Sequence, residues 1–382
     1  MTPTTVAFWT AVAALVYVYF GYPLVAFVLS RLAARRVRKD AIEPTVTIVI
    51  AAHNEEAHLG HTIENKLALA YPQSKVQILV VSDGSTDRTD EIARGFSSRG
   101  VQFFRQEPRN GKTSALNLAA GHATGELIVF ADANSLYDAT ALAHLTANFA
   151  DPTVGYVTGK LRYANADGSM TGDGCSTYMK YENLIRTFET GFGSVVGVNG
   201  GIDAVRRALY APMHPDDLPD LVLPLNVVAR GSRVVYEPNA LLSETAHGNS
   251  ADEYRMRVRV ALRSLWTLKE MSGLLNIARY GVYAIQLISH KLLRYLAFAF
   301  MVTTLITSAL LWSTAPVYRV AFLAHVVFFA CAYLGYLAER LGRPNRLLFI
   351  PYYFALVNMA ALQAVVKFLK GERFRVWNPR LG

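Results

Sequence analysis

The first thirty residues of the chain carry no charged side chain. Within them, Val6 to Leu29 is apolar over more than the roughly 20 residues that a helix needs to cross a bilayer. A cleavable signal peptide would start with basic residues and have a shorter apolar core, so this stretch predicts a retained membrane helix. The rest of the chain must therefore fold beside a membrane or within it.

Basic residues follow the apolar stretch directly, and they are Arg31, Arg35, Arg36, Arg38 and Lys39. Positive residues close to a membrane span stay in the cytoplasm. We therefore expect a protein of the inner (plasma) membrane whose chain after the first helix is cytosolic. The formal net charge of +9 is then membrane-flanking charge, so membrane lipids are expected partners and nucleic acid is not.

Three further apolar stretches follow near the end of the sequence: Tyr295 to Trp312, Val320 to Ala338 and Leu347 to Val366. If all three crossed the membrane, the basic tail after them would lie outside, against the charge rule. The third stretch contains Pro351 and Asn358, which suit a bent or re-entrant helix. We therefore expect a multi-pass protein with a cytosolic C-terminus, in which this third stretch does not cross fully.

From Pro44 to about Pro238, apolar β-branched runs alternate with helical segments. The segments "TVTIVIAAHNEE", "VQFFRQEP" and "ELIVFADANS" are typical of strands, "GKTSALNLAAGHA" of a helix, and "VQILVVSDGSTDRTDEIARGF" of a strand, a turn and a helix. Such alternation predicts a parallel sheet with helices on its faces. The apolar runs are nearly continuous, so both faces of the sheet should be buried.

Acidic residues end three of these predicted strands, and they are Glu55 and Glu56, Asp83, and Asp132. Ligands of open α/β sheets bind beyond the carboxyl ends of the strands. Asp132 and Asn134 are two residues apart, so in an extended segment both would point to the same side. They predict either a ligand site at this edge or only a strand-end turn.

Two common nucleotide-binding signatures do not fit the sequence. The run Gly111-Lys112-Thr113 suggests a P-loop, but the position that needs a glycine, five residues before Gly111, is Gln106. No G-x-G-x-x-G follows the first predicted strand, so a dinucleotide-binding fold is not supported either.

The segments "AAHNEE", "VVSDGSTD", "NGKTSALNLA" and "FADAN" resemble, in order and spacing, the nucleotide-sugar-binding half of family 2 glycosyltransferases. The resemblance continues through "YENLIRTFETGFGSVVGVNGGIDAVRRALY" and "LPDLVLPLNVVARGSRVVYEPNA". It is greatest to the membrane-bound members related to cellulose, chitin and hyaluronan synthases. The implied fold class is α/β, a GT-A (Rossmann-like) mixed sheet in the cytosol with flanking transmembrane and interfacial helices.

The expected organisation has five parts. Residues 1–39 form the N-terminal transmembrane helix and its basic flank, and 40–250 the cytosolic GT-A glycosyltransferase domain. Residues 251–294 form amphipathic interface helices, 295–370 the C-terminal membrane helices, and 371–382 a basic tail.

The resemblance places the metal-binding D-x-D motif of the family at Asp132 and Asn134. Oxygen ligands suit a divalent cation, Mg²⁺ or Mn²⁺, which stabilises the charge of a departing diphosphate. Asn134 is neutral where the family usually has aspartate, and one negative charge fewer should weaken the site.

The resemblance assigns Ala51, His53, Glu55 and Asp83 to a uridine pocket, where a carboxylate can accept a hydrogen bond from the uracil N–H. Asp83 and Asp87 could equally stabilise turns and helix ends in "DGSTD". Lys112 precedes a predicted helix and suits a phosphate, although a single lysine is more often simply solvated. In the tail "ERFRVWNPRLG", the resemblance implies that Trp377 and Arg380 close over the nucleotide; a disordered basic tail is the alternative.

An inverting transfer needs a carboxylate that takes a proton from the acceptor hydroxyl. The resemblance places this base at Asp220, with Asp217 as the second choice, and the residue before Asp220 is Pro219 where the family usually has an acid. The alternative is that Asp220 only caps a helix that begins at Leu221.

The segment "EYRMRVRVALRSLW" predicts a basic amphipathic helix, with Arg255, Arg259 and Arg263 on one face. Its alternative role is to lie on anionic lipid headgroups. The family carries Q-x-x-R-W here, and matching on Arg259 leaves Met256 and Val260 in the other two positions. The resemblance implies that Arg259, Asn199 and Gly200 lie on the acceptor side.

These expectations describe an inverting glycosyltransferase that moves a sugar from a UDP-sugar to a growing exopolysaccharide or other glycan at the cytosolic membrane face. Two alternatives stay open: a single addition to a lipid-linked acceptor, and a catalytically silent scaffold that binds nucleotide sugars. A second copy of the chain or an export partner is compatible with either.

Overall fold

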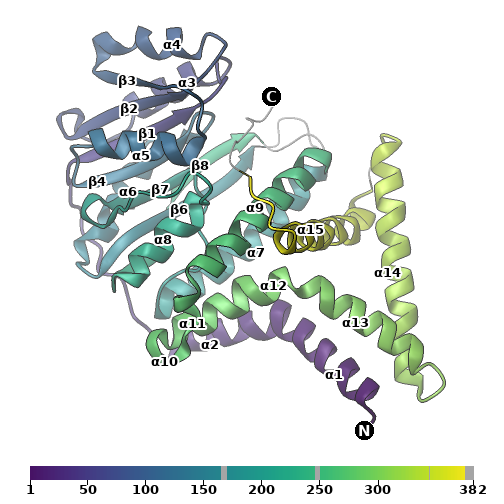
Figure 1. Ribbon diagram of the computed structural model, residues 1–382. Helices are drawn as coiled ribbons and strands as arrows, with labels where there is room; N and C mark the ends of the chain where they lie inside the picture. Colours follow the sequence, from purple (N-terminus) through teal and green to yellow (C-terminus); the bar gives the residue numbers. More distant parts are fainter. Residues whose placement is uncertain (165–169, 246–249, 344, 375–382) are drawn as a thin grey trace. The chain divides into compact units, whose positions relative to one another are not determined.

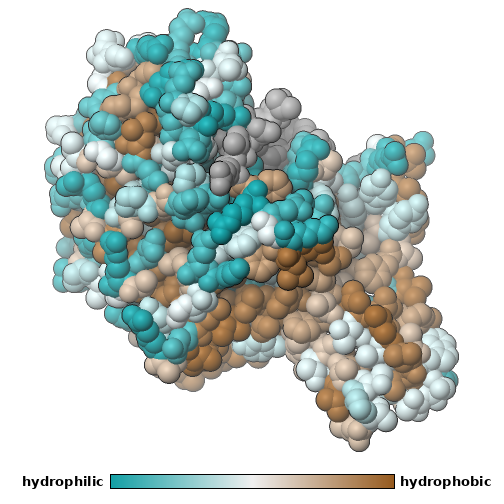
Figure 2. All heavy atoms as spheres, viewed as in Figure 1, coloured by the Kyte–Doolittle hydropathy of each residue, from teal (hydrophilic) through white to brown (hydrophobic). Residues whose placement is uncertain are grey.

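The computed structural model describes residues 1–164, 170–245, 250–343 and 345–374 of the chain. The chain forms two compact units. The sheet unit comprises Leu29–Ala164, Met179–Thr245 and Arg373–Gly382, and the membrane-helix unit comprises Met1–Val28, Asn165–Tyr178 and Ala246–Glu372. Figure 2 shows that hydrophobic residues dominate the surface of the membrane-helix unit, whereas hydrophilic residues are common on the sheet unit.

The sheet unit is built on one eight-stranded mixed sheet of order β3-β2-β1-β4-β7-β6-β8-β5 (Figure 1). Its strands are β1 (Val46–Ala52), β2 (Val76–Asp83), β3 (Val101–Gln106), β4 (Leu127–Asp132), β5 (Leu136–Tyr137), β6 (Val154–Ala164), β7 (Ile202–Arg206) and β8 (Arg233–Thr245). Strands β1 to β4 are parallel, β7 is antiparallel to both β4 and β6, and β8 is parallel to β6. The predicted α/β sheet is confirmed.

Helices cover this sheet, and they are α3 (Leu59–Leu67), α4 (Thr89–Gly95), α5 (Lys112–His122), α6 (Ala141–Ala147), the second half of α7 (Met170–Phe192) and α8 (Pro219–Ala229). Every residue of β1 is buried, as continuous apolar strands between two helical layers should be. One core includes Ile48 and Ile50 of β1, Val80 of β2 and Val129 of β4.

The strand register aligns the ends of the parallel strands. Asp132 of β4 lies opposite Ala51 of β1, and Asp83 of β2 lies opposite Gln106 of β3. Because β6 and β8 run in the same direction as β4, the carboxyl end of β8 and the amino end of β7 reach the same edge. Residues far apart in the sequence therefore meet there.

The membrane-helix unit supplies most of the apolar helices. Among the described residues, three are long and apolar enough to cross a membrane: Pro3–Leu32, which joins α1 (Pro3–Val16) to α2 (Tyr22–Leu32), then α14 (Pro316–Arg340), and Leu347–Leu369 of α15 (Arg346–Leu369). A fourth span exists if the bent pair Val282–Tyr295 and Ala297–Leu310 counts as one. This bend measures 58°.

The expected bend at Leu347–Val366 is wrong, because α15 continues through Pro351 without a break. Pro351 lies in the second turn of α15, and Asn345 caps that end by accepting hydrogen bonds from the backbone N–H groups of Leu347 and Leu348. At this position the proline removes the one backbone hydrogen bond that its own N–H would donate, and the helix continues past it. The sharp bend lies instead between α12 (Leu293–Tyr295) and α13 (Ala297–Leu310).

Helix α9 (Ser250–Glu270) packs on α15 through apolar and polar contacts. Leu262 and Leu265 form a cluster with Ala364. Buried Glu253 accepts hydrogen bonds from Arg257 at 2.8 Å and from the Tyr353 hydroxyl at 2.9 Å. The predicted amphipathic segment is thus a single helix whose inner side also contains a buried ion pair.

Candidate active site

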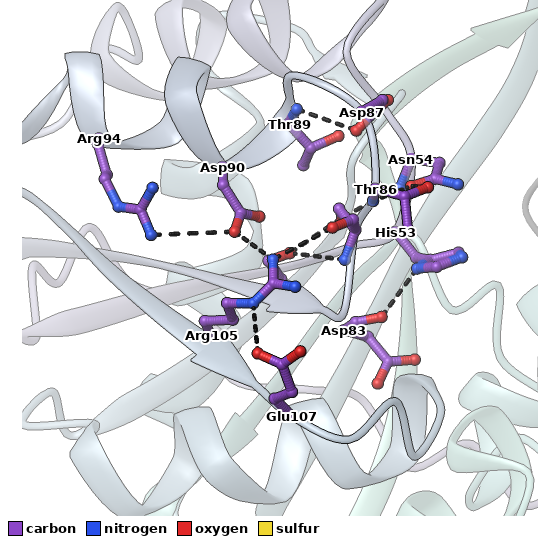
Figure 3. Close-up of polar contacts among 12 residues, drawn as sticks. His53, Asn54, Asp83, Thr86, Asp87, Thr89, Asp90, Arg94, Arg105 and Glu107 are labelled. Atoms are coloured by element: carbon purple, nitrogen blue, oxygen red, sulfur yellow. Dashed lines mark hydrogen bonds and ion pairs between the residues drawn. The ribbon is translucent and has the colours of Figure 1, made fainter.

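The loops after β1 and β2 are joined by hydrogen bonds at the carboxyl edge of the sheet (Figure 3). The side-chain carbonyl of Asn54 accepts from the backbone N–H of Thr86 at 2.8 Å, and the backbone N–H of Glu55 donates to the Thr89 hydroxyl at 2.8 Å. Asp87 accepts from the N–H groups of Glu56 and Thr89. The turn role considered for Asp87 is what the structure shows.

Asp83 is the centre of a hydrogen-bond network under the next loop. Its Oδ1 accepts from Gln106 Nε2 at 2.6 Å and from the Asn110 N–H at 2.8 Å, while Oδ2 accepts from the Gly111 N–H at 2.9 Å. Arg109 Nε lies 3.6 Å from Oδ2. The carboxylate therefore holds the 106–111 loop in place before any ligand arrives.

The other predicted pocket residues line the same edge and are buried: Ala51, His53 and Glu55. His53 Nδ1 lies 2.8 Å from the backbone oxygen of Asp83 (Figure 3). Burial, reinforced by the charge of Arg109, lowers the pKa of His53 from its ordinary value of 6.5. A neutral His53 is thus fixed between the two loops.

Lys112, the first residue of α5, donates to Oδ1 of Asp132, the last residue of β4. Burial alone would lower the pKa of Lys112, but the charges of Asp132, Asp220 and Glu244 together raise it above its ordinary value. Lys112 is therefore a charged group among three carboxylates, and not the solvated lysine considered from the sequence.

Asn134 lies in the turn after β4 rather than in the strand, so the alternation argument does not apply to it. Side chains of helix α3 hold this turn by hydrogen bonds to its backbone. The Thr62 hydroxyl donates to the Ala133 carbonyl at 2.7 Å, and Lys66 Nζ donates to the Ser135 carbonyl at 2.6 Å. Lys66 is almost completely buried, and burial lowers its pKa well below the ordinary value of 10.5 although Glu244 and Asp132 oppose this.

Two glycines before β7 bring Asp220 and Glu244 to the site. A Cβ placed on Gly200 would lie 2.6 Å from the Cγ of Asp220. A Cβ placed on Gly201 would lie 3.1 Å from Glu244 Oε1 and 3.4 Å from Asp132 Oδ2. The Gly200–Gly201 segment thus lies between the predicted base and the predicted metal ligand. The positive φ and the close carboxylate of Asp220 require glycine at position 200, whereas the atoms nearest to Gly201 are the ends of flexible side chains.

Asp220 lies in the first turn of α8, whose cap residue is Leu218. The expected helix start at Leu221 is thus two residues late, and Asp220 is not the N-cap. The second choice, Asp217, accepts from the backbone N–H of His214 at 2.8 Å, which is a turn contact.

The residues predicted for the acceptor side belong to different units. Asn199 is held in the sheet unit by Arg186, which donates to its side-chain oxygen at 2.6 Å and to the Gly197 carbonyl at 2.9 Å. Arg259 lies in α9 of the membrane-helix unit. Trp377 and Arg380 fall outside the described residues.

Three buried charged residues of this site were not predicted from the sequence, and they are Lys66, Asp203 and Glu244. Glu244 lies near the end of β8, so it obeys the same rule of a strand-ending acid that identified Asp83 and Asp132. That signal was present in "ALLSET". Lys66, in contrast, occupies a helix of ordinary composition and offers no such signal.

Asp132 and Asn134 are the residues of this site that could hold a divalent cation. Within the described part of the chain, no three His, Cys, Asp or Glu side chains lie close enough to hold a metal. Asp132 has a partly exposed side chain, and its Oδ2 faces the bare backbone of Gly201. The donor set of one carboxylate and one amide fits a hard cation whose other ligands come from a diphosphate and water.

The mixed sheet with acids at its carboxyl edge has the GT-A fold. Residues 47–210 match the family described as Glycosyl transferase family 2. Residues 47–210 thus form a domain of that family, and candidate membrane helices lie on both sides of the matched range.

Curated relatives match parts of the chain. It is 35% identical over 129 residues to "Probable glycosyltransferase YdaM" of Bacillus subtilis, which is 32% of this chain and 31% of the relative. It is 27% identical over 222 residues to poly-beta-1,6-N-acetyl-D-glucosamine synthase of Staphylococcus aureus, which is 56% of this chain and 53% of the relative. The matches thus span about half or less of these relatives' length.

Among solved structures, a mannosyltransferase of Pyrobaculum calidifontis in complex with GDP-Man and Mn²⁺ has the same fold. Its TM-score is 0.72 at 21% identity, and the match covers 95% of this chain and 99% of that one.

Proposed function

We propose that the chain is a membrane-anchored, metal-dependent, inverting glycosyltransferase that uses a UDP-sugar at the cytosolic face. The observation that carries the proposal is the arrangement of Asp132, Lys112 and Asp220 around Gly200–Gly201. These residues would supply a metal ligand, a cation that binds phosphate and a general base close to one another, and glycosyl transfer needs these three groups.

Asp132 would hold the divalent cation, Mg²⁺ or Mn²⁺, together with Asn134. When bound, the cation stabilises the negative charge of the departing diphosphate. Lys112 exchanges its contact with Asp132 for a phosphate oxygen, and its raised pKa keeps it charged as it does so. The N-terminus of α5, where Lys112 stands, adds the positive end of a helix dipole.

Asp220 takes the proton from the acceptor hydroxyl as that oxygen attacks the anomeric carbon. The attack comes from the face opposite the diphosphate, which inverts the anomeric configuration. The Gly200–Gly201 segment separates Asp220 from Asp132, so the base and the metal ligand approach the sugar from two sides. Asn199 and Gly200 border the acceptor's path.

The nucleoside would lie over Ala51, His53, Glu55 and Asp83, at the carboxyl ends of β1 and β2. The basic residues after α15 favour a C-terminus in the cytosol, on the same side as this pocket.

The acceptor is a growing exported glycan. Likeness to a poly-beta-1,6-N-acetyl-D-glucosamine synthase supports a polymer product. A specific observation favours the second candidate, a single addition to a lipid-linked acceptor: Met256 and Val260 occupy the positions of the Q-x-x-R-W glutamine and tryptophan.

The test is nucleotide release by the detergent-purified chain, offered UDP-sugars and GDP-sugars with Mg²⁺, Mn²⁺ or chelator. We expect UDP release from one sugar, lost with chelator and in Asp220→Asn. Sizing of the product then separates a polymer from a single addition. Release of GDP alone would contradict the proposed donor, and binding of UDP without turnover on any acceptor would support the silent scaffold.

A further inference from the structure

Asp203 is a buried carboxylate that none of the proposed roles uses. It lies in β7, with no exposed surface, two residues after Gly201. Its Oδ2 accepts from the Gly200 N–H at 2.8 Å and from the Tyr156 hydroxyl at 3.0 Å. Asp203 thus fixes the backbone of Gly200 from beneath.

Gly200 in turn supports the carboxylate of Asp220. Its φ of +86° is accessible to glycine and strained for other residues. The Oδ2 of Asp220 lies 2.6 Å from the position of a Gly200 Cβ, so the carboxylate lies directly against this residue. The neighbouring carbonyl of Gly201 accepts from the Tyr137 hydroxyl at 2.9 Å. The segment is therefore held at both ends.

The two carboxylates also interact through their charges. Burial raises the pKa of Asp203 to about 7, and the charge of Asp220 adds to this rise, whereas hydrogen bonds from Thr158, Tyr156 and Gly200 oppose it. Such an interaction is mutual, so ionised Asp203 makes Asp220 harder to ionise and hence a stronger base.

The other titratable groups around Asp203 do not change charge near neutral pH. Burial, and next the charge of Asp203, raise the pKa values of Tyr137 on β5 and Tyr156 on β6 well above the ordinary value of 10.0. Both tyrosines stay neutral. From α8, the acid that acts on Asp203 is Asp220.

We propose that Asp203 is a positioning residue for the base: it holds Gly200 beneath Asp220, and its charge strengthens Asp220 as a proton acceptor. This inference rests on the proposed function, because Asp220 is the base only if the chain transfers sugars. It adds a residue that has no motif of its own, and it predicts a pH dependence that a purely structural aspartate would not produce.

The kinetic test compares the pH profiles of kcat for the wild type and Asp203→Asn. In the wild type, kcat should rise as the pH passes about 7, where Asp203 ionises. In Asp203→Asn this rise should be absent. At pH values above about 7, kcat of this variant should be roughly 10-fold lower than that of the wild type, which is a smaller loss than removal of the base itself would cause. The KM for the donor should not change.

The matched control is Asp151→Asn. Asp151 is also a buried aspartate, which accepts from Thr153 and from the Arg38 N–H, but it precedes β6 and so lies at the opposite edge of the sheet. Its loss should lower the melting temperature and leave the pH profile unchanged. Tyr156→Phe is the milder variant if Asp203→Asn does not fold: without that hydroxyl the rise in kcat should move to higher pH.

A second measurement does not need turnover. The infrared carbonyl band of a protonated buried carboxylic acid should titrate with a midpoint near pH 7 in the wild type and be absent in Asp203→Asn. In Asp220→Asn the midpoint should fall, because the charge that helps to raise it is gone. A midpoint unmoved by Asp220→Asn, or an identical pH profile in Asp203→Asn, overturns the inference while wild-type turnover still upholds the proposed function.

Discussion

The ammonium of Lys112 and the carboxylate of Asp132 form an ion pair that joins the first turn of α5 to the last residue of β4. Both groups belong to motifs that sequence alone assigned to separate tasks, phosphate and metal. The pair shows how the chain neutralises these charges before a nucleotide arrives. If a diphosphate and a cation bind as we propose, each of the two groups would gain a new partner of opposite charge, so neither would be left buried and unpaired.

Asp220→Asn should lower kcat by about 10²- to 10⁴-fold, because it removes the base that takes the proton from the hydroxyl of the sugar acceptor. Binding of UDP, measured by calorimetry, should stay within a few-fold of the wild type. Asp217→Asn is the control, because that carboxylate accepts from the His214 N–H in a turn. A large loss of kcat in Asp217→Asn with none in Asp220→Asn would reverse the assignment.

Asn134→Asp should strengthen the site for the divalent cation, because it restores a negative charge among the oxygen ligands. The Mn²⁺ concentration needed for half-maximal activity should fall on the order of 10-fold. The control is Gln102→Glu, which adds the same charge at an exposed residue near the amino end of β3. It should leave the Mn²⁺ titration unchanged. An Asn134→Asp chain with an unaltered titration would place the metal elsewhere.

Arg257→Met should destabilise the membrane-helix unit by about 3 kcal/mol, because it leaves Glu253 as a buried carboxylate without its cation. Thermal unfolding in detergent measures this. Arg255→Met is the matched control on the same helix. Arg255 pairs with Asp252 where both side chains are well exposed, so its loss should change the melting temperature little. Equal effects of the two variants would refute a buried ion pair.

His53 should contribute a pH-dependent part of the stability. Because its folded pKa is lowered, the folded chain binds fewer protons than the unfolded chain just below pH 6.5. The contribution is therefore complete above pH 6.5 and is lost as the pH falls toward the folded pKa. The stability difference between the wild type and His53→Gln should shrink in that window.

The effect of His53 must be measured as the difference in stability between the wild type and His53→Gln, because Asp203 changes the stability with pH in the opposite direction. Its raised pKa makes the folded chain bind more protons, so its effect on stability is unfavourable as the pH rises toward 7.

Sequence alone predicted the part of the site that lies within single strands. β1, β2 and β4 are apolar runs, and the structure confirms the three strands and their shared edge. β2 and β4 end in acids as expected, whereas β1 ends at Ala52 and Glu55 lies in the loop after it. These features are local, and a chain of alternating strands and helices has few ways to arrange them.

The rest of the site depends on contacts across the sheet. Asp203, Glu244 and Gly200 come together because β7 runs antiparallel between β4 and β6 and because β8 follows β6. No local pattern specifies that order. The bend between Tyr295 and Ala297 was also missed, because no proline marks it in the sequence. Pro351 is the obvious helix breaker, yet it lies inside a continuous helix.

The hydrogen bonds on Asp83 have a consequence for the choice of nucleobase. Three donors and the charge of Arg109 already act on this carboxylate. If a nucleobase binds here, its N–H competes with these contacts, and the exchange of one hydrogen bond for a similar one changes the free energy little. We then expect Asp83 to contribute more to the shape of the 106–111 loop than to the choice between a pyrimidine and a purine donor.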